Sequence, residues 1–414
     1  MEILFLHQNF PAQFKHLAPS LVKLGHKVVA IRVGKNKINT LNNIDIYEYL
    51  PEKIGYKTHP WLNYLETKVI RAECVLRICE DLKKEGFNPD IIIAHPGWGE
   101  TLFVKEVWPK SKLVIYCEYY YISQNGDLGF DPEFPEENYL NSRIKLKNLF
   151  NHMNFDIADL GISPTKWQAS TYPELFRKKI SVIHDGIDTS ILKPYDGSII
   201  RLKKNMGYKA SDEIITYVSR NLEPYRGFHT FMRAIPELMR LRPNAKILVI
   251  GGNDKGYGQA PPKNKSWRDI YYDEIKDNID RERLIFLGKV SYQSYIQHLQ
   301  ISSIHIYLTY PFVLSWSMLE AMSIGCIVLG SSTKPVQEVI QDELNGYLID
   351  FFDSSGLAKK VNEILKLSPL EQNVIRLNAR RTIESQYELN NSLEKQIALI
   401  KSLNDSKSSD DLNS

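Results

Sequence analysis

Short apolar runs alternate with amphipathic helical patterns along most of this chain, and this alternation is the strongest constraint on its fold. One series of strand-length runs lies at residues 2–7, 27–33, 90–95, 112–121 and 180–186, and a second at 213–220, 246–252, 284–290, 304–309 and 326–332. Strands that alternate with helices form parallel sheets with right-handed crossovers. The pattern predicts an α/β protein with two doubly wound, Rossmann-like domains that face each other across a cleft.

The join between the two domains is expected in residues 184–197, HDGIDTSILKPYDG, which are rich in Gly, Asp and Pro. We place the first domain at residues 1–190 and the second at residues 191–386. A last helical pattern at about 387–403 is expected to cross back to the first domain. The polar tail at 404–414 is expected to be disordered.

Composition excludes several classes of protein. The 414 residues carry a net charge of +3, which argues against a general nucleic-acid binder. Four cysteines without a CxxC pair indicate thiols in a reducing cytosol. We expect a soluble cytoplasmic protein. Basic residues at 143–147 and 177–179 leave peripheral contact with the inner face of a membrane open, with a solvated face as the alternative.

Loops that follow the strands are the candidate binding segments, because ligands of parallel sheets bind beyond the carboxyl ends of the strands. Arg220 and Arg226 lie in such a loop, RNLEPYRG. Two guanidinium groups at the mouth of a sheet suit a diphosphate, since each offers forked donors that stay charged. The alternative is a pair of solvated surface arginines.

A second loop, in YPFVLSWSMLEAMSIG (310–325), combines a helix start with a carboxylate in an apolar stretch. Backbone N–H groups at a helix start suit an anion, and they belong here to Leu314, Ser315, Trp316 and Ser317. Burying Glu320 without a partner would be costly. Two vicinal hydroxyls of a ribose would satisfy it; the alternative is that Glu320 caps its own helix.

Weaker candidates flank these loops. Gly252 ends a strand in GGNDKGYG, and the turn backbone around Lys289 and Val290 suits a base edge. In the first domain, HPGWGE, CEYYY and HQNFP follow strands. Carboxylates and aromatic rings there suit a carbohydrate, with a core histidine and packed tyrosines as the alternative. The candidates in these three loops are His95, Gly97, Trp98, Glu118, Tyr120, Gln8, Asn9 and Phe10.

Several motifs are absent from the sequence. It contains no GxxxxGK[ST] and no HExxH, and no GxGxxG follows the first strand. No DxD lies at a strand end, so a metal-held diphosphate is not supported. We therefore expect no metal site and no cofactor, and assign neutralisation of the phosphates to Arg220 and Arg226.

These motifs together resemble the family-4 retaining glycosyltransferases of the GT-B fold, whose C-terminal domain is of the glycosyl transferases group 1 type. Residues 310–332 resemble the family's E-x7-E segment, and SRNLEPYRGF (219–228) its G-R-x4-K-G motif. The resemblance implies that Arg220 and Arg226 contact the donor diphosphate, with Arg226 where the family usually has Lys. Glu320 matches the second Glu and would bind the ribose. Phe312 stands at the first Glu, and Glu118 falls near a usual catalytic His.

The function implied by this resemblance is metal-independent transfer of a hexose, with retention, from a UDP- or GDP-linked sugar. The acceptor would be a glycan, a lipid-linked molecule or a protein. Catalysis would rest on Arg220 and Arg226, with Glu118 and His95 beside the acceptor. Two other classes stay open: a nucleotide-sugar epimerase, and a catalytically silent sugar-binding protein, which the loss of the first Glu favours.

Overall fold

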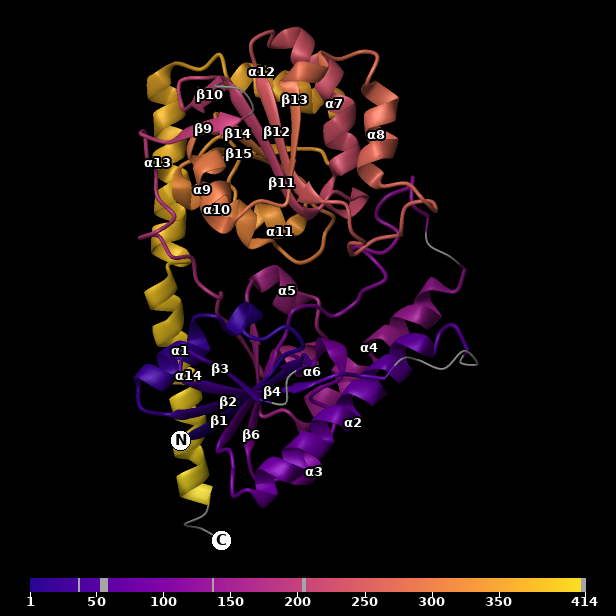
Figure 1. The fold of residues 1–414 in the computed structure, drawn as a ribbon, viewed down its shortest axis with the longest axis vertical. Helices are drawn as coiled ribbons and strands as arrows, with labels where there is room; N and C mark the ends of the chain where they lie inside the picture. The colour runs from indigo at the N-terminus through magenta and orange to yellow at the C-terminus, as the bar shows by residue number, and fades with distance from the viewer. Residues whose placement is uncertain (36–37, 53–58, 136–137, 203–205, 411–414) are drawn as a thin grey trace. The chain divides into compact units, whose positions relative to one another are not determined.

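The computed structural model describes residues 1–414 apart from 36–37, 53–58, 136–137, 203–205 and 411–414 (Figure 1). The chain forms two compact units. The first contains Met1–Gly129, Pro135–Gly186 and Leu389–Ser414, and the second contains Phe130–Phe134 and Ile187–Glu388. The crossing from Gly186 to Ile187 lies within the segment 184–197.

The sheet of the first unit has the strand order β3-β4-β2-β1-β5-β6-β7-β8. Neighbouring strands are parallel except for β3 with β4. Strand β5, IIIA, is buried at every position, as expected for a parallel strand covered on both faces. The strands are β1 (Glu2–Leu6), β2 (Lys27–Val33), β3 (Ile38–Leu41), β4 (Ile44–Tyr49), β5 (Ile91–Ala94), β6 (Lys112–Tyr116), β7 (Leu160–Ser163) and β8 (Ile180–Val182).

Helices cover both faces of this first sheet. One core cluster joins Val75 and Cys79 of α2 to the strands, and another joins Leu17 and Leu21 of α1 to Ile400 of α14. The last helix therefore belongs to the first unit. The helices are α1 (Leu17–Lys23), α2 (Asn63–Lys84), α3 (Val104–Val107), α4 (Leu140–Ile157), α5 (Lys166–Ser170), α6 (Glu174–Arg177) and α14 (Leu389–Asp410).

The second unit contains a parallel sheet in the order β13-β12-β11-β14-β15-β16 and a separate antiparallel pair, β10-β9. In Figure 1 the parallel strands lie between α7 and α8 on one side and α9, α10 and α13 on the other. The strands are β9 (Ile199–Leu202), β10 (Met206–Lys209), β11 (Ile214–Asn221), β12 (Lys246–Gly252), β13 (Leu284–Gly288), β14 (Ile304–Tyr307), β15 (Ile327–Ser331) and β16 (Tyr347–Ile349).

The helices of the second unit begin with clear sequence signals. Helix α13, for example, starts with a capping box between Ser368 and Glu371 and has Pro369 as its first residue. The helices are α7 (Phe228–Leu241), α8 (Trp267–Ile275), α9 (Tyr292–Gln300), α10 (Trp316–Ile324), α11 (Lys334–Gln337), α12 (Ser354–Ile364) and α13 (Pro369–Gln386). The expectation of two doubly wound α/β domains is confirmed.

Several elements differ from the sequence-based expectation: β3, β4, β9, β10 and β16 lie outside the two expected series, and β8 ends at Val182, not at residue 186. Strand β6 ends at Tyr116, not at residue 121, because side chains accept the hydrogen bonds of the backbone beyond it. Tyr120 N donates to Thr171 Oγ1, and Tyr121 N donates to Asn148 Oδ1. Helix α14 runs to Asp410, past the expected helix end at 403. Of the tail expected to be disordered, residues 411–414 lie outside the described residues.

Strand order reverses at β1 in the first sheet and at β11 in the second. Strand β1 pairs with β2 and β5, and β11 pairs with β12 and β14. Ligands of open α/β sheets bind beyond the carboxyl ends of the strands at such reversals. A ligand site is therefore expected in the loops after β1 and β5 and in those after β11 and β14.

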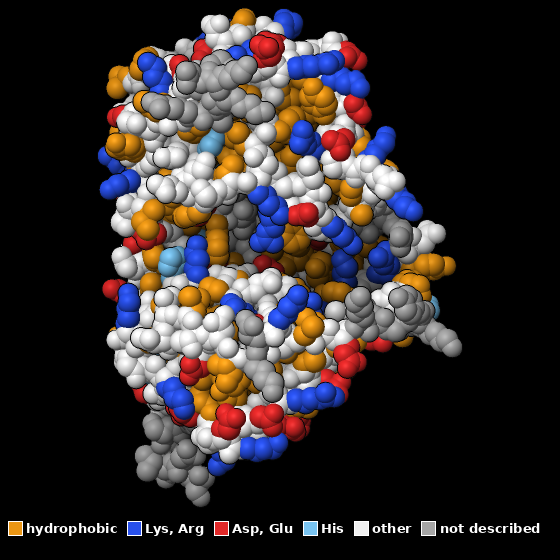
Figure 2. Space-filling view, viewed as in Figure 1, with side chains coloured by type: hydrophobic (Ala, Val, Ile, Leu, Met, Phe, Trp, Pro, Cys, Tyr) orange, Lys and Arg blue, Asp and Glu red, His pale blue; other side chains and the backbone are white. Residues whose placement is uncertain are grey.

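Charge gives no further guide to a site. Basic and acidic side chains are interspersed on the visible surface (Figure 2), as the net charge of +3 suggests. Among the described helices, none is both long and apolar enough to cross a membrane.

Candidate functional site

Arg226 connects the two loops that leave the reversal point of the second sheet. It lies in the turn after β11 and is 8% exposed. Its Nη1 donates to Thr309 Oγ1 at 2.7 Å and to the Val313 carbonyl at 3.1 Å, both in the loop after β14. Burial alone would lower the pKa of Arg226, but nearby tyrosines, Tyr307 foremost, and Glu223 raise it overall. A charged guanidinium is thus fixed at this edge.

Arg220 supplies a second guanidinium at the end of β11. Its side chain is exposed, whereas the next residue, Asn221, is buried. Asn221 Nδ2 donates to the Lys255 carbonyl at 3.3 Å, and its Oδ1 has no hydrogen-bond partner among the described residues. The two arginines therefore differ in their contacts. Arg226 is held by hydrogen bonds within the protein, whereas the exposed side chain of Arg220 is accessible to a ligand.

Glu223, which the sequence analysis did not single out, connects this turn to the loop after β12. Its Oε2 accepts hydrogen bonds from the backbone N–H of Tyr257 at 2.7 Å and of Gly258 at 3.2 Å. Burial raises the pKa of Glu223, although these bonds and the two arginines oppose the rise. A Cβ at Gly256 would lie about 2.0 Å from the carboxylate, so only glycine fits there. The loops after β11, β12 and β14 are thus linked.

Gly252, Lys289 and Val290 lie beside this edge. Gly252 ends β12, and a Cβ there would meet Lys289 Cε at 2.4 Å and Asn221 Oδ1 at 2.8 Å. Lys289 is exposed and forms an ion pair with Asp254. Val290 is partly buried against the core cluster that contains α10. A side chain at position 252 would therefore require Lys289 and Asn221 to move.

The first turn of α10 lies at the carboxyl end of β14. Ser315 is its N-cap, and its Oγ accepts from Ser317 N at 3.3 Å. The N–H of Ser315 donates to Tyr307 Oη at 2.9 Å. Leu314 and Trp316 are partly exposed beside them. The structure therefore places the start of a nine-residue helix where the sequence predicts it, with the positive end of the helix dipole at this edge.

Glu320 has two partners within the chain. Its Oε1 accepts from Tyr292 Oη and its Oε2 from Tyr295 Oη, each at 2.8 Å. It does not cap α10, because Ser315 does so. A carboxylate oxygen has a second lone pair, so these bonds do not preclude a ligand hydroxyl. The i, i+3 spacing of the tyrosines on α9 was the available sequence signal.

Phe312, at the position of the acid expected from the family motif, is 5% exposed. Its ring packs edge-on against Tyr225 at 5.6 Å and near Tyr257 at 5.1 Å. This position is therefore an apolar contact between the loops after β11, β12 and β14.

Phe130–Phe134 belongs to the second unit although its chain neighbours belong to the first. Asp131, 2% exposed, accepts from Tyr310 Oη at 2.6 Å and lies 3.1 Å from His229 Nε2. Burial pushes the pKa of Asp131 up, but these partners bring it below its ordinary value. Glu133 and Arg233 form a paired ion contact nearby. The segment thus holds the loop after β14, which sequence reasoning missed.

In the first unit, His7, Gln13, Glu118 and His95 form a polar chain at the carboxyl ends of β1, β5 and β6. His7 Nε2 bonds Gln13 Oε1 at 2.8 Å, and Gln13 Nε2 donates to Glu118 Oε1 at 3.3 Å. His95 Nε2 lies 3.4 Å from Glu118 Oε2. Burial, with a smaller contribution from His95, lowers the pKa of His7 to about 3, so its imidazole is neutral. The structure brings the predicted His95 and Glu118 together.

The ring of His95 is held in place by its surroundings. It is 2% exposed and stacks on Trp98 at 4.2 Å between ring centroids. Its Nδ1 accepts from Gly97 N at 3.1 Å, which leaves the proton on Nε2. Among the described residues, that Nε2 has no hydrogen-bond partner. A Cβ at Gly97 would clash with this ring at 2.7 Å. A buried nitrogen of His95 therefore lies beside the Glu118 carboxylate.

The remaining first-domain candidates differ in their settings. Phe10 is 2% exposed within the core, so its side chain is not available to an acceptor. Asn9 is exposed, and its N–H donates to His7 Nδ1 at 2.9 Å. Gln8 Oε1 accepts from Arg71 Nη1, a residue of α2 that the sequence analysis did not single out. Tyr120 Oη bonds His152 Nε2 at 2.8 Å and is not part of the polar chain.

No group of three or more His, Cys, Asp or Glu side chains in the described ranges is arranged to hold a metal ion. The candidate groups of each unit are organic. In the second unit these are two guanidinium groups, a helix start and a carboxylate. In the first unit they are a carboxylate and a buried imidazole.

Two families match the two halves of the chain. Residues 24–192 match Glycosyl transferase family 4 group, and residues 200–382 match Glycosyl transferases group 1. An uncharacterized glycosyltransferase of Methanocaldococcus jannaschii is 22% identical over 94% of this chain and 92% of its own length. The N-acetyl-alpha-D-glucosaminyl L-malate synthase of Bacillus anthracis is 25% identical over 51% of this chain, and the match spans 50% of that relative.

Solved structures share the fold. Sucrose-phosphate synthase from Thermosynechococcus elongatus has a TM-score of 0.75 at 15% identity, over 97% of this chain and 99% of that one. Anabaena HepE in complex with UDP has a TM-score of 0.70 at 15% identity, over 97% and 100%. At these identities the likeness concerns the fold, and it confirms the expected GT-B architecture.

Proposed function

We propose that this chain, which belongs to the glycosyl transferases group 1 family, takes the sugar it transfers from a nucleotide-linked donor bound to the second unit. The observation that carries the proposal is the pair Arg220 and Arg226 at the reversal point of the sheet, beside the start of α10. Both features stabilise a diphosphate. Anabaena HepE, which has the same fold, was solved with UDP and with UDP-glucose.

The proposed reaction transfers a hexose with retention. The bond between the anomeric carbon and the diphosphate oxygen breaks, and the acceptor hydroxyl oxygen bonds that carbon from the same face. The hydroxyl proton passes to the departing diphosphate. Arg220, Arg226 and the α10 dipole stabilise the charge that develops on this leaving group, which is the main electrostatic task of such a site. No side-chain nucleophile is needed.

The acceptor is proposed to bind the first unit, with Glu118 and His95 beside its hydroxyls. Glu118 is partly exposed and accepts hydrogen bonds, and His95 Nε2 is a buried donor. An acceptor and a donor side by side suit a carbohydrate hydroxyl, which has both capacities. The acceptor class is a glycan, a lipid-linked molecule or a protein.

The test is the Arg220→Ala variant, with Arg240→Ala as its matched control. Arg240 is an exposed arginine of α7 outside the site. Removing one preorganised charge from a leaving-group site lowers turnover by about 10²–10³-fold. We expect this loss in Arg220→Ala and none in Arg240→Ala, with unchanged melting temperatures in both. The assay measures release of free nucleotide from UDP- and GDP-linked sugars. Unchanged turnover in Arg220→Ala contradicts the proposal.

One observation favours a second candidate, a silent sugar-binding protein. Phe312 fills with an aromatic ring the position where the family motif has an acid. Such a protein would bind a nucleotide sugar, measured by calorimetry, and release no nucleotide. Release of free nucleotide identifies a transferase, whereas conversion of the donor alone into an epimeric nucleotide sugar identifies an epimerase.

A further inference from the structure

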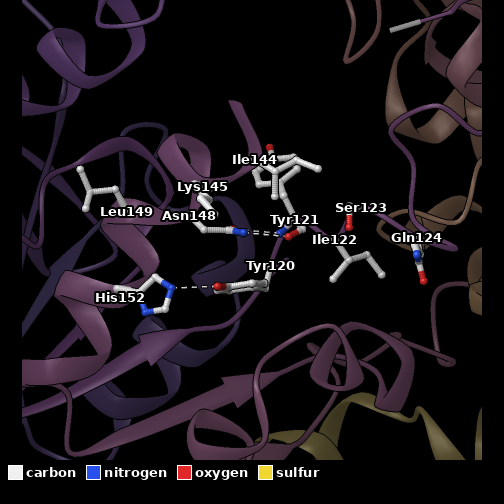
Figure 3. A pocket seen from close by; sticks show the side chains of 10 residues that line it. All are labelled: Tyr120, Tyr121, Ile122, Ser123, Gln124, Ile144, Lys145, Asn148, Leu149 and His152. Atoms are coloured by element: carbon white, nitrogen blue, oxygen red, sulfur yellow. Dashed lines mark hydrogen bonds between the residues drawn. The ribbon is translucent and has the colours of Figure 1, made fainter. Parts of the chain in front are cut away.

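A pocket of about 570 Å³ opens on the first unit between residues 120–124 and helix α4 (Figure 3). Pockets of this volume hold molecules of the size of a substrate or drug. The pocket is not part of the polar chain formed by His7, Gln13, Glu118 and His95. It is lined by Tyr120, Tyr121, Ile122, Ser123, Gln124, Ile144, Lys145, Asn148, Leu149 and His152.

Two side chains of α4 hold the walls of this pocket in place. Asn148 bonds the Tyr121 backbone twice: its Oδ1 accepts from Tyr121 N at 3.0 Å, and its Nδ2 donates to Tyr121 O at 2.7 Å. His152 Nε2 bonds Tyr120 Oη at 2.8 Å. In Figure 3 both links run between α4 and the 120–124 segment. The pocket is therefore anchored on both sides.

The lining combines apolar surface with positive charge. Ile122, Ile144 and Leu149 supply apolar surface, and Leu149 is 41% exposed. Lys145 is the cation, and none of the ten lining residues is Asp or Glu. Helix α4 also carries Arg143 and Lys147 before its first acid, at residue 156. An apolar cavity with a cationic rim is complementary to an amphiphile that has a negatively charged group.

The pocket lies close to the polar chain along the backbone. Tyr120 follows Glu118 by two residues, and two residues span at most about 7 Å. The backbone at the edge of the pocket therefore lies within about 7 Å of the backbone that carries the carboxylate proposed to face the acceptor.

We propose that this pocket binds the apolar aglycone of an acceptor whose negatively charged group, a phosphate or a carboxylate, lies next to the hydroxyl that receives the sugar. The inference rests on the proposed transferase function and names its acceptor class. Lys145 contacts the charged group, and Ile122, Ile144 and Leu149 contact the apolar part.

The test is isothermal calorimetry on the full chain without donor. The probes are dodecyl phosphate and dodecanoate below their micelle concentrations, with dodecyl maltoside and inorganic phosphate as controls. We expect saturable one-to-one binding of at least one of the two anionic amphiphiles, with each control binding more weakly. The dodecyl phosphate and dodecanoate arms separate a phosphate from a carboxylate acceptor.

Lys145→Gln should weaken binding of the anionic amphiphile about tenfold through loss of one charge-assisted contact. Leu149→Ala should weaken it several-fold through lost apolar area, by roughly 25 cal/mol per Å². The matched controls are Lys23→Gln on α1 and Leu175→Ala on α6, both exposed and outside the lining. Wild-type affinity in both pocket variants, or anionic amphiphiles that bind no better than inorganic phosphate, would overturn the proposal.

Nucleotide release in the same preparations separates the two proposals. If the amphiphile binds as expected and nucleotide is released from a UDP- or GDP-linked sugar, both proposals stand. If it binds but release from every nucleotide sugar is absent, the transferase proposal fails and the amphiphile site stands. If release is robust and no amphiphile binds, the transferase stands and the acceptor class is refuted.

Discussion

Replacing Glu320 would separate its structural contribution from any contact with the donor. Its carboxylate oxygens accept from Tyr292 and Tyr295, each at 2.8 Å. A hydrogen bond to a charged group contributes about 1.5–3 kcal/mol net when buried. Tyr295 is 8% exposed, so its hydrogen bond contributes the full value. Tyr292 is 50% exposed, and its hydroxyl can bond water instead. Glu320→Ala should therefore lower the free energy of unfolding by about 2–4 kcal/mol.

Glu320→Gln keeps one oxygen acceptor, and the new amide N–H can donate to a tyrosine oxygen. Its expected cost is about half as large, roughly 1–2 kcal/mol. Tyr295→Phe removes only the buried hydroxyl and should cost a similar amount, while Tyr292→Phe should cost less than about 1 kcal/mol because water replaces that bond. Urea unfolding of the four variants gives these values from the shift in midpoint.

The affinities of the variants for UDP and GDP, measured by calorimetry, then test whether Glu320 contacts the donor. If Glu320 binds ribose hydroxyls, Glu320→Gln should weaken nucleotide binding about tenfold or more. Tyr295→Phe should leave the affinity near that of the wild type, because its hydroxyl is buried behind the carboxylate. Glu320→Ala unfolding at the wild-type midpoint would refute the structural reasoning. Wild-type nucleotide affinity in Glu320→Gln would refute the ribose contact.

Three further predictions concern other buried groups. Arg226→Lys keeps the charge found at this position in the resembling family, so turnover should fall by no more than about tenfold, against about 10²–10³-fold in Arg226→Met. Burial lowers the pKa of His305 to about 3; because the unfolded chain takes up this proton below about pH 6.5, stability should fall from pH 6.5 to pH 3. His305→Gln should reduce that slope by up to about 1.4 kcal/mol per pH unit, checked by urea midpoints across this range, and an unchanged slope would contradict the assignment. Asp131→Ala leaves the buried Tyr310 hydroxyl without its acceptor and removes the carboxylate that lies 3.1 Å from His229 Nε2, and should cost about 2–4 kcal/mol. The exposed Asp277→Ala control should cost less than about 1 kcal/mol, and equal midpoints for these two variants would refute the buried contact.

The sequence was informative about the fold where its patterns are local. Buried parallel strands such as IIIA at Ile91–Ala94 are continuous apolar runs, and helix starts such as Ser368–Glu371 carry their own capping chemistry. It was less informative where side chains end a strand. Tyr120 and Tyr121 have strand-like composition, yet Thr171 and Asn148 bond their N–H groups and remove them from the sheet. Those partners are distant in the sequence.

Site placement was predictable to the level of loops. Parallel strands bring their carboxyl ends to one edge, so the segments that hold Arg226, Ser315 and His95 follow directly from strand order. The partners of these residues did not follow from strand order. Tyr292 and Tyr295 donate hydrogen bonds to the carboxylate of Glu320 from a different helix. Nothing in the apolar stretch around Glu320 indicates these partners.

The sequence by itself determined two α/β sheets and the loops at their reversal points, because hydrophobic periodicity and turn residues act over a few positions. Only the tertiary structure decided which buried polar groups meet. Asp131 and Tyr310 are 179 residues apart and bond at 2.6 Å. Such a contact depends on the path of the whole chain through both units, and the free energy of pairing a buried carboxylate appears only once that path is complete.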